Sequence, residues 1–434
     1  MKKAALHNLG CKVNAYETEA MQQMLEEAGY EIVPFHEKAD VYVINTCSVT
    51  NMADRKSRQM LHRAKKQNPD AIVVAAGCYV QTKEQEVLED MAIDIVIGNN
   101  KKHELVSRIN SFLADKSDNS DVIDINREKQ EYEELFLAQT AEHTRAFIKV
   151  QDGCNQFCSY CIIPYARGRV RSRNIKNVLE EITKLSDKGF KEVVLTGIHL
   201  SSYGVDTGEN LLHLIQEVHK IEGIKRIRLG SLEPRVITEE FASELSKLPK
   251  ICPHFHLSLQ SGCDATLARM NRKYTSKEYE DGCIRLRKYF KHPAITTDII
   301  VGFPGEDAKE FALSKEFARR IHFYEMHIFK YSKRQGTRAA VMENQVPEEI
   351  KTKRSSELIE LGEQMSKEFR DYYIDSVQEV LFEEESQIGG VNYYVGYTKE
   401  YLKVATKSGK NLENELVSGR ITGHLTNDVY LMEC

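Results

Sequence analysis

The chain has 434 residues, enough for two or three domains with cores of their own. It begins without a long apolar segment, and no stretch approaches the roughly 18 apolar residues that a membrane span needs. We therefore expect a soluble, cytoplasmic protein with no membrane partner. Ten cysteines without a secretion signal favour metal or redox chemistry over a framework of disulfides.

The net charge of −5 averages over unlike regions. Residues 1–135 carry 17 Lys and Arg against 23 Asp and Glu, residues 136–373 carry 38 against 32, and residues 374–434 carry 5 against 10. Affinity for a polyanion follows the local field more than the total charge. A bound polyanion is therefore expected mainly on the basic middle region.

The first third of the chain alternates apolar strand-like runs with helical patterns, which predicts a parallel α/β sheet domain over residues 1–114. The expected strands cover residues 4–9, 40–44, 71–76 and 94–97, and the expected helices cover 15–28, 52–67, 83–90 and 101–112. Residues 115–143 are rich in Asp, Glu, Lys and Ser and lack periodicity, which predicts a linker.

Three of these strands lead directly into a cysteine: Cys11, Cys47 and Cys78. The carboxyl ends of parallel strands face one crevice, so these distant residues are expected to converge there. The pattern indicates a three-thiolate [4Fe–4S] site with one open iron. The alternative is that cysteine serves as a small buried residue at strand ends.

From residue 144 a second alternating pattern begins, and its six β/α units predict a partial barrel over residues 144–346. The expected strands lie near residues 146–151, 192–196, 225–229, 254–258, 295–300 and 322–329. A charged helical run over 347–374 is expected to lead outward, because its charges are too dense for a fully buried helix.

The last region, residues 375–434, contains short β-type runs separated by turn residues, which predicts a small antiparallel barrel. The runs cover residues 377–382, 391–396, 401–405, 416–422 and 429–432.

The loop after the first barrel strand contains Cys154, Cys158 and Cys161 in a C-x3-C-x2-C array. A structural zinc or an electron-transfer cluster takes four protein ligands, so a compact triplet predicts a [4Fe–4S] cluster with one iron open to a small molecule. The alternatives are a zinc site completed by a distant His, and three buried thiols. The remaining cysteines are expected to be packing or surface thiols: Cys252, Cys263, Cys283 and Cys434.

The C-x3-C-x2-C spacing resembles the signature of radical S-adenosylmethionine (SAM) enzymes, and the chain resembles a radical SAM methylthiotransferase along essentially its full length. The resemblance lies in LGCKVN at 9–14, NTCSVT at 45–50, GC at 77–78, residues 153–173, LQSG at 259–262 and DIIVGFPGE at 298–306. It implies an N-terminal auxiliary-cluster domain, a radical SAM barrel and a C-terminal TRAM barrel that grips RNA.

The resemblance also implies the chemistry. One SAM methylates a sulfur held on the auxiliary cluster of Cys11, Cys47 and Cys78. A second SAM is cleaved at the other triplet to a radical that removes the substrate hydrogen, so that C–H becomes C–S–CH3. The reaction requires an electron donor and a sulfur source. Beyond the cluster ligands, no catalytic side chain is predicted.

Further contacts are expected at barrel strand ends and in arginine-rich segments. Those expected for the cofactor are Gly197, Gln260, Ser261, Asp298 and Arg173, and those expected for the substrate are Arg167, Arg171, Arg334 and Arg338. The alternative roles are turn and cap residues for the first group and solvation of the loop for the arginines. After Gly197 the superfamily often has an acid that holds the methionyl amine. His199 follows closely here, so that contact must be made differently.

The surroundings of Cys11 and Cys47 most resemble the branch that acts on N6-threonylcarbamoyladenosine in the anticodon stem-loop of tRNA. Its carboxylate needs a cation, whereas an isopentenyl group favours an apolar pocket. Two alternatives within the family are N6-isopentenyladenosine in tRNA and an aspartate of a ribosomal protein. A non-catalytic iron–sulfur or zinc RNA-binding module is an alternative from another class.

Overall fold

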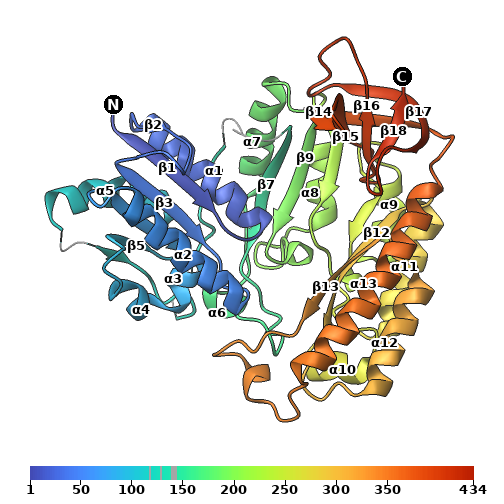
Figure 1. Cartoon of the computed structure of the whole chain (residues 1–434), viewed down its shortest axis with the longest axis horizontal. Helices are drawn as coiled ribbons and strands as arrows, with labels where there is room; N and C mark the ends of the chain where they lie inside the picture. Colours follow the sequence, from blue (N-terminus) through green and yellow to red (C-terminus); the bar gives the residue numbers. More distant parts are fainter. Residues whose placement is uncertain (117–118, 128–129, 138–143) are drawn as a thin grey trace.

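The computed structural model describes residues 1–116, 119–127, 130–137 and 144–434. The chain passes from an N-terminal sheet domain through a central barrel to a small barrel that sits against one end of the central one (Figure 1). The predicted fold class is confirmed. Within the described part of the chain, no helix has the length and apolar character required to cross a membrane.

The N-terminal domain is a parallel sheet of strand order β2-β1-β3-β4-β5-β6. Its strands are β1 (Lys3–Asn8), β2 (Glu31–Ile32), β3 (Val41–Thr46), β4 (Ile72–Gly77), β5 (Ile95–Ile97) and β6 (Ser120–Asp121). Its helices are α1 (Lys12–Glu27), α2 (Asn51–Gln67), α3 (Cys78–Thr82), α4 (Glu84–Leu88) and α5 (Leu105–Ala114), the last preceded by the turn η1 (Lys102–Glu104). The expected helix over 83–90 is instead the short α4, with α3 just before it.

Helices cover both faces of this sheet. Leu61 of α2 packs on one face, and Met21 of α1 and Ile109 of α5 pack on the other. The central strand β3 is consequently buried along its whole length. Part of the predicted linker, 115–143, joins this domain: β6 extends the sheet, and Leu137 packs against Tyr16 of α1. Its residues 117–118, 128–129 and 138–143 lie outside the described residues.

The central barrel is open and consists of two sheets, β10-β9-β7-β8 and β11-β12-β13. Its strands are β7 (Arg145–Asp152), β8 (Arg171–Ser172), β9 (Glu192–Gly197), β10 (Arg226–Leu229), β11 (His254–His256), β12 (Ala294–Val301) and β13 (Glu325–Lys330). Parallel bridges Ile227–Ile251 and Leu232–Leu257 join the sheets. The six parallel strands therefore follow the chain order expected for a partial barrel, and β8 is an unpredicted antiparallel addition.

Helices wrap the outside of the barrel. They are α6 (Ile163–Arg167), α7 (Ile175–Asp187), α8 (Leu211–His219), α9 (Glu239–Ser246), α10 (Asp264–Arg269), α11 (Ser276–Tyr289) and α12 (Ala308–Ile321), with turns η2 (Leu200–Ser202), η3 (Pro234–Val236) and η4 (Arg338–Val341). Strand alternation gives β12 two faces: Ile295 and Ile299 join the core beneath the helices, whereas Asp298 lies on the opposite face. The barrel thus has an apolar outer core and a polar inner face.

The charged helix α13 (Glu348–Asp371) was expected to lead outward, yet it lies along β13. Its Leu358, Leu361 and Met365 join the barrel core, and two of its charged residues, Lys351 and Arg354, are buried with partners in the barrel. An amphipathic stripe therefore suffices to dock a helix with many charges.

The C-terminal region is a closed barrel of order β14-β15-β16-β18-β17. Its strands are β14 (Val377–Ile388), β15 (Val391–Tyr397), β16 (Lys403–Thr406), β17 (Leu416–His424) and β18 (Tyr430–Glu433). The pairs are antiparallel as predicted, except that β16 and β18 run parallel.

This barrel is fastened to the central one by buried arginines. Arg226 donates to the Tyr397 carbonyl at 2.8 Å, and Arg228 donates to the Lys399 carbonyl at 3.0 Å. The ring of Tyr401 stacks on that of His254 at 4.9 Å. The C-terminal barrel is therefore part of the folded body.

Candidate functional site

The first three predicted cysteines meet at one edge of the N-terminal sheet. Cys11 follows β1, Cys47 follows β3 and Cys78 opens α3 after β4, and these strands are neighbours in register. Gly10 has a φ of +111°, and a Cβ there would lie 2.9 Å from the Cys47 sulfur. Burial raises the pKa of Cys47 to about 11, and the nearby Cys78 and Cys11 thiols act in the same direction. We call these residues the auxiliary triplet.

Three asparagines hold the loops of the auxiliary triplet. The Asn14 amide donates to the carbonyls of Leu9 at 2.7 Å and Thr46 at 3.0 Å. Asn45 donates to the Asn14 carbonyl at 3.0 Å, and Asn99 donates to the Cys78 sulfur at 3.5 Å. Asn14 and Asn45 thus fix the backbone near Cys11 and Cys47, and Asn99 contacts the third thiol directly.

The second predicted set, which we call the radical triplet, lies in one loop after β7. The loop is closed by Cys154 N–H donating to the Gly168 carbonyl at 3.0 Å. Gly153 has a φ of +70°, and a Cβ there would lie 1.8 Å from the Arg169 carbonyl oxygen, so only glycine fits. Cys154, Cys158 and Cys161 are all half-buried.

The donor chemistry of both triplets fits an iron–sulfur cluster with an open iron. Among the described residues the other cysteines lie elsewhere: Cys252, Cys263 and Cys283 are buried and Cys434 is exposed near the C-terminus. Three thiols without a fourth leave one iron of a [4Fe–4S] cluster unligated by the protein. Burial raises the pKa of Cys154 to about 11 and that of Cys161 to about 12, so cluster binding must displace thiol protons.

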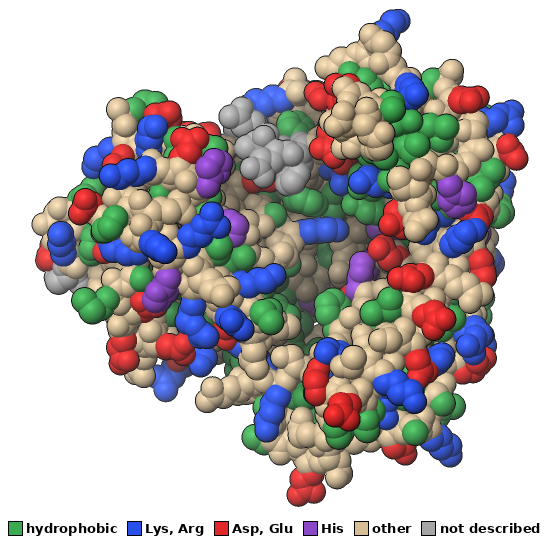
Figure 2. All heavy atoms as spheres, in the orientation of Figure 1, with side chains coloured by type: hydrophobic (Ala, Val, Ile, Leu, Met, Phe, Trp, Pro, Cys, Tyr) green, Lys and Arg blue, Asp and Glu red, His purple; other side chains and the backbone are tan. Residues whose placement is uncertain are grey.

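The two triplets are neighbours in space. Helix α3, which begins with Cys78, packs against α6, which begins two residues after Cys161. The Asn99 amide that contacts Cys78 also donates to the carbonyl of Ala166 in α6 at 2.8 Å. The space-filling view shows a hollow between the N-terminal domain and the barrel, with Lys, Arg and His side chains inside it (Figure 2).

A buried charge network joins the same two regions. Glu17 of α1 is fully buried and pairs with Arg167 at 2.8 Å, Lys149 at 2.7 Å and Lys102 at 3.1 Å. Burial alone would raise the pKa of Glu17, but these cations hold it well below its ordinary value. Asp152, next to the radical triplet loop, also pairs with Lys149 and Arg167. The network fixes the N-terminal domain on the barrel.

The network corrects the expected roles of three arginines. Arg167 was expected to contact substrate, but it is buried between Glu17 and Asp152. Arg171 was also expected at the substrate, but it is buried, donates to the Arg169 carbonyl at 3.1 Å and lies 3.6 Å from Asp152. Arg173 was expected at the cofactor, but its guanidinium is enclosed by Glu181 and the Leu135 carbonyl. Their donors point into the protein, where a phosphate has no access.

The two arginines of the loop after β13 differ from each other. Arg334 is buried and pairs with Asp54 and Ser48, in the segment that follows Cys47. It therefore joins the two domains. The sequence predicted a cation free to contact the substrate, but the charge of Arg334 is already paired. Arg338 is exposed, and within the described parts of the chain it has no hydrogen bond or ion pair. Of the four arginines predicted for the substrate, it alone presents its charge to solvent.

A cation that the sequence predictions missed is Lys12, which follows Cys11 and begins α1, a helix packed against β7 and β9. Its side chain is exposed and has no partner among the described residues. Neighbouring protein nevertheless keeps part of the solvent from the ammonium, and this desolvation lowers its pKa to about 8, with Arg228 and Arg145 acting in the same direction. The pattern K-V-N after the cysteine carried no signal that the ammonium would lie near barrel residues.

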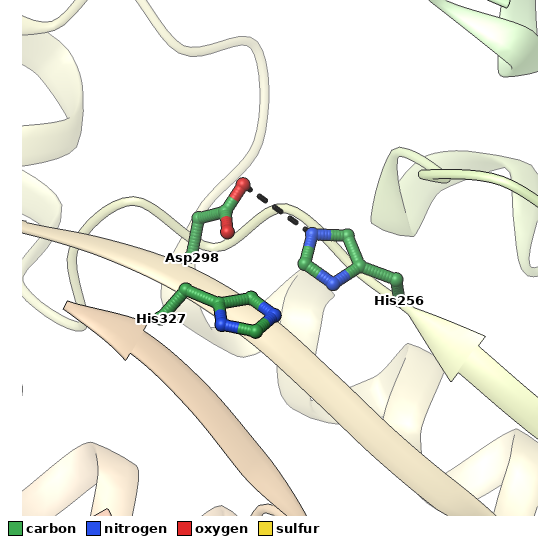
Figure 3. Close-up of side chains that lie close together, drawn as sticks. All are labelled: His256, Asp298 and His327. Carbon is green, nitrogen blue, oxygen red and sulfur yellow. Dashed lines mark ion pairs between the residues drawn. The ribbon is translucent and has the colours of Figure 1, made fainter. Parts of the chain in front are cut away.

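Of the predicted cofactor contacts, Gln260 and Ser261 follow β11, whereas Asp298, expected at a strand end, lies inside β12. Gln260 has a φ of +70°, and its N–H donates to the Asp298 carbonyl at 2.8 Å. Ser261 is buried and caps the N–H of Cys263 at 3.2 Å. Asp298 points toward His256, at 3.3 Å, with His327 alongside (Figure 3).

His256 and His327 were not predicted, because lone histidines carry no motif. Their rings lie 5.8 Å apart, and ligand atoms of His256, His327 and Asp298 all fall within 4.8 Å of one another. This arrangement offers hydrogen bonds to hydroxyls and has donors suited to a cation.

The predicted Gly197 ends β9, and a Cβ there would lie 2.9 Å from the Gln151 side chain, which explains the glycine. Gln151 accepts from the N–H of His199 at 2.7 Å and donates to the Gly153 carbonyl at 2.7 Å. The end of β9 is thereby coupled to the loop of the radical triplet.

Comparison with known proteins supports this picture. The model of the Radical SAM superfamily matches residues 148–318, which include the radical triplet, and that of the uncharacterized protein family UPF0004 matches residues 3–98. Membership of the radical SAM superfamily implies a [4Fe–4S] cluster and SAM. Among solved structures, the radical SAM methyltransferase TsrM from Kitasatospora setae has a TM-score of 0.58 over 79% of this chain and 77% of its own, at 14% identity, which shows the shared fold.

Curated relatives extend over nearly the whole chain. The threonylcarbamoyladenosine tRNA methylthiotransferase MtaB of Bacillus subtilis is 43% identical over 97% of this chain and 94% of its own. The tRNA-2-methylthio-N(6)-dimethylallyladenosine synthase of Acetivibrio thermocellus is 35% identical over 97% of this chain and 88% of its own. The chain belongs to the family of radical SAM tRNA methylthiotransferases.

Proposed function

We propose that this enzyme methylthiolates N6-threonylcarbamoyladenosine in the anticodon stem-loop of tRNA, at C2 of its adenine. The observation that carries the proposal is the adjacency of two three-thiol sites, linked through Asn99 between Cys78 and Ala166. The relative from Bacillus subtilis, which is named for this nucleoside, supports the choice of substrate.

The auxiliary triplet is proposed to hold a second [4Fe–4S] cluster, with its open iron available for sulfur. When bound, the two clusters and SAM supply the radical and the methylated sulfur that convert C–H to C–S–CH3. Cys11, Cys47 and Cys78 would hold one cluster, and Cys154, Cys158 and Cys161 the other. An electron donor and a sulfur source are further proposed partners, because the reaction consumes both.

The chain's own residues position the reactants and exclude water. Phe303 packs against Tyr160, inside the loop of the radical triplet, and against Tyr331 of the loop after β13. This apolar cluster shields one side of the triplet. Asp298 and Gln260, at the barrel's second sheet, offer hydrogen bonds to the ribose hydroxyls of SAM.

We assign the cation that receives the threonyl carboxylate to Lys12. Its ammonium is unpaired, adjoins the cluster ligand Cys11 and lies near the guanidinium groups of Arg145 and Arg228. An incoming carboxylate would relieve this crowding of positive charge. A neutral isopentenyl group offers no such compensation.

The C-terminal barrel is proposed to grip RNA, chiefly through exposed side chains such as Lys407 and Lys410. A test by deletion from residue 375 is unsuitable, because it would expose the apolar Tyr324 and Phe369, which pack against the C-terminal barrel, and would remove carbonyl partners of Arg226 and Arg228. Lys407→Gln with Lys410→Gln keeps the fold. This double variant is expected to bind tRNA a few-fold more weakly and to cleave SAM as the wild type does.

The substrate proposal is tested with tRNA carrying threonylcarbamoyladenosine, tRNA carrying isopentenyladenosine and tRNA lacking both. Wild-type enzyme is expected to turn over the first, and Lys12→Gln is expected to lose that preference while Lys12→Arg retains it. Iron content checks that the cluster next to Lys12 is intact. Preferential turnover of the isopentenyl form by the wild type would overturn the substrate proposal and leave the family assignment standing.

A further inference from the structure

The segment after β9 lacks the acid that radical SAM enzymes often have there, but another acid, Glu233, lies near the loop of the radical triplet. Glu233 follows β10 and is 7% exposed. Its N–H is held by the Ser201 hydroxyl at 2.8 Å, and its carboxylate meets the His199 ring at 3.1 Å. The backbone and one carboxylate oxygen are therefore fixed, and the carboxylate is held at the strand ends where the barrel opens.

A chain of hydrogen bonds leads from this acid to the radical triplet. Glu233 contacts His199, the N–H of His199 donates to Gln151, and Gln151 donates to the Gly153 carbonyl, one residue before Cys154.

A cation also contacts the radical triplet. Arg272 donates to the Cys158 sulfur at 3.2 Å and to the Ser258 carbonyl at 3.4 Å. Its ring neighbour is Tyr274, whose centroid lies 4.8 Å away. In the described structure no carboxylate forms an ion pair with it, although Glu233 acts on it from farther away. The half-buried guanidinium thus has hydrogen-bond acceptors but no paired carboxylate, so its positive charge is available to a bound anion.

An amino-acid group needs this pair of charges. The methionyl end of SAM has an ammonium or amine and a carboxylate on one carbon, and both must face the open iron. A fixed carboxylate accepts from the amine, and a guanidinium donates to the carboxylate in a charge-assisted pair. Glu233 and Arg272 provide these two partners next to the loop of the radical triplet.

We propose that Glu233 receives the methionyl amine of SAM and that Arg272 receives its carboxylate, so that the end of β10 supplies the acid absent after Gly197. Asp298 and Gln260, on the second sheet, are left for the nucleoside end. The inference does not depend on which tRNA nucleoside is modified, because it concerns the cofactor alone.

The test measures cofactor binding to the cluster-loaded, unreduced enzyme by equilibrium dialysis with labelled SAM. Glu233→Gln and Arg272→Met are each expected to raise the Kd at least tenfold with iron content unchanged, and Glu233→Asp is expected to recover part of the loss. Glu240→Gln, at an exposed position of the following helix, is the matched control and should bind as wild type. An unchanged Kd in Glu233→Gln would overturn the assignment.

Matched analogues separate a direct contact from a structural role. On an analogue lacking the amino group, Glu233→Gln should bind as wild type, whereas Arg272→Met should still bind more weakly. With decarboxylated SAM, Arg272→Met should bind as wild type, whereas Glu233→Gln should still bind more weakly. Equal losses with SAM and with both analogues would mean that the two residues only support the loop, which would overturn the proposal. Spectra of the reduced cluster without cofactor verify that the variants retain the cluster environment.

Discussion

The two cysteine triplets of this enzyme are built on different principles. The radical triplet lies within one loop, whose shape is set locally by Gly153 and by the hydrogen bond from Cys154 to Gly168. The auxiliary triplet is assembled from three strand ends, so it exists only when the whole sheet is folded. The first site is therefore a property of a segment, and the second is a property of a domain.

Because the two sites belong to different domains, the interface between the domains must set their relative position. A reaction that needs both clusters needs their relative position fixed, and neither loop can do this alone. The buried charges around Glu17 and the Arg334 contact to Asp54 connect the two regions at separate points. The comparison predicts that variants at the ligands change chemistry, whereas variants at the interface change stability and coupling.

The largest effect is expected from removing each set of ligands. Changing Cys154, Cys158 and Cys161 together to Ala should lower the iron content from about eight to about four per chain and abolish SAM cleavage. Changing Cys11, Cys47 and Cys78 to Ala should lower iron equally but keep cleavage and lose methylthiolation. Anaerobic iron assay and product analysis measure both. Cys434→Ala, at the exposed C-terminus, is the control. Full iron in both triple variants would contradict the assignment of the sites.

The next effect is expected at the centre of the interface. Glu17→Gln leaves Arg167, Lys149 and Lys102 buried with less compensating charge, which should lower the free energy of unfolding by about 3–5 kcal/mol. Urea denaturation measures this loss. Glu26→Gln, at an exposed position of the same helix, should be nearly neutral. Equal stability of the two variants would show that the network contributes nothing.

The Glu17 carboxylate should also make the stability of the protein depend on pH in the acid range. The folded-state pKa of Glu17 lies well below its ordinary value of about 4.3, so its stabilising contribution is present above that pH and is lost as the pH falls through the folded-state pKa. Below about pH 5 the stability of the wild type should therefore fall more steeply than that of Glu17→Gln. Parallel curves for the two proteins would contradict this account.

A smaller effect is expected at the second connection between the regions. Arg334→Met leaves Asp54 buried with only the Ser48 hydroxyl as a partner, which should cost about 2–3 kcal/mol. It should also lower the amount of methylthiolated product per SAM consumed, because the loop after β13 loses its contact with the segment that follows Cys47. Arg338→Met is the matched control for stability. An unchanged product ratio would show that this contact is structural only.

The sequence predicted the three-region architecture because hydrophobic periodicity and strand-end cysteines are local signals. It could not predict which arginines are available. Arg167, Arg171 and Arg334 are as charged in the sequence as Arg338, but their partners Glu17, Asp152 and Asp54 come from distant parts of the chain. Glu233 and Lys12 were missed for the same reason, since burial and neighbours decide their roles.

The smallest expected effect is that of Arg338→Gln on RNA binding. Arg338 is exposed and unpaired among the described residues, on the loop after β13 near the contact with the auxiliary triplet's domain. One lost phosphate contact should weaken tRNA binding by only a few-fold and reduce the slope of log K against log salt by about 0.9. The loss should be the same for tRNA with and without the threonylcarbamoyl group, because a phosphate contact does not sense the modified base. If instead only the modified tRNA bound more weakly, Arg338 rather than Lys12 would be the cation that receives the carboxylate.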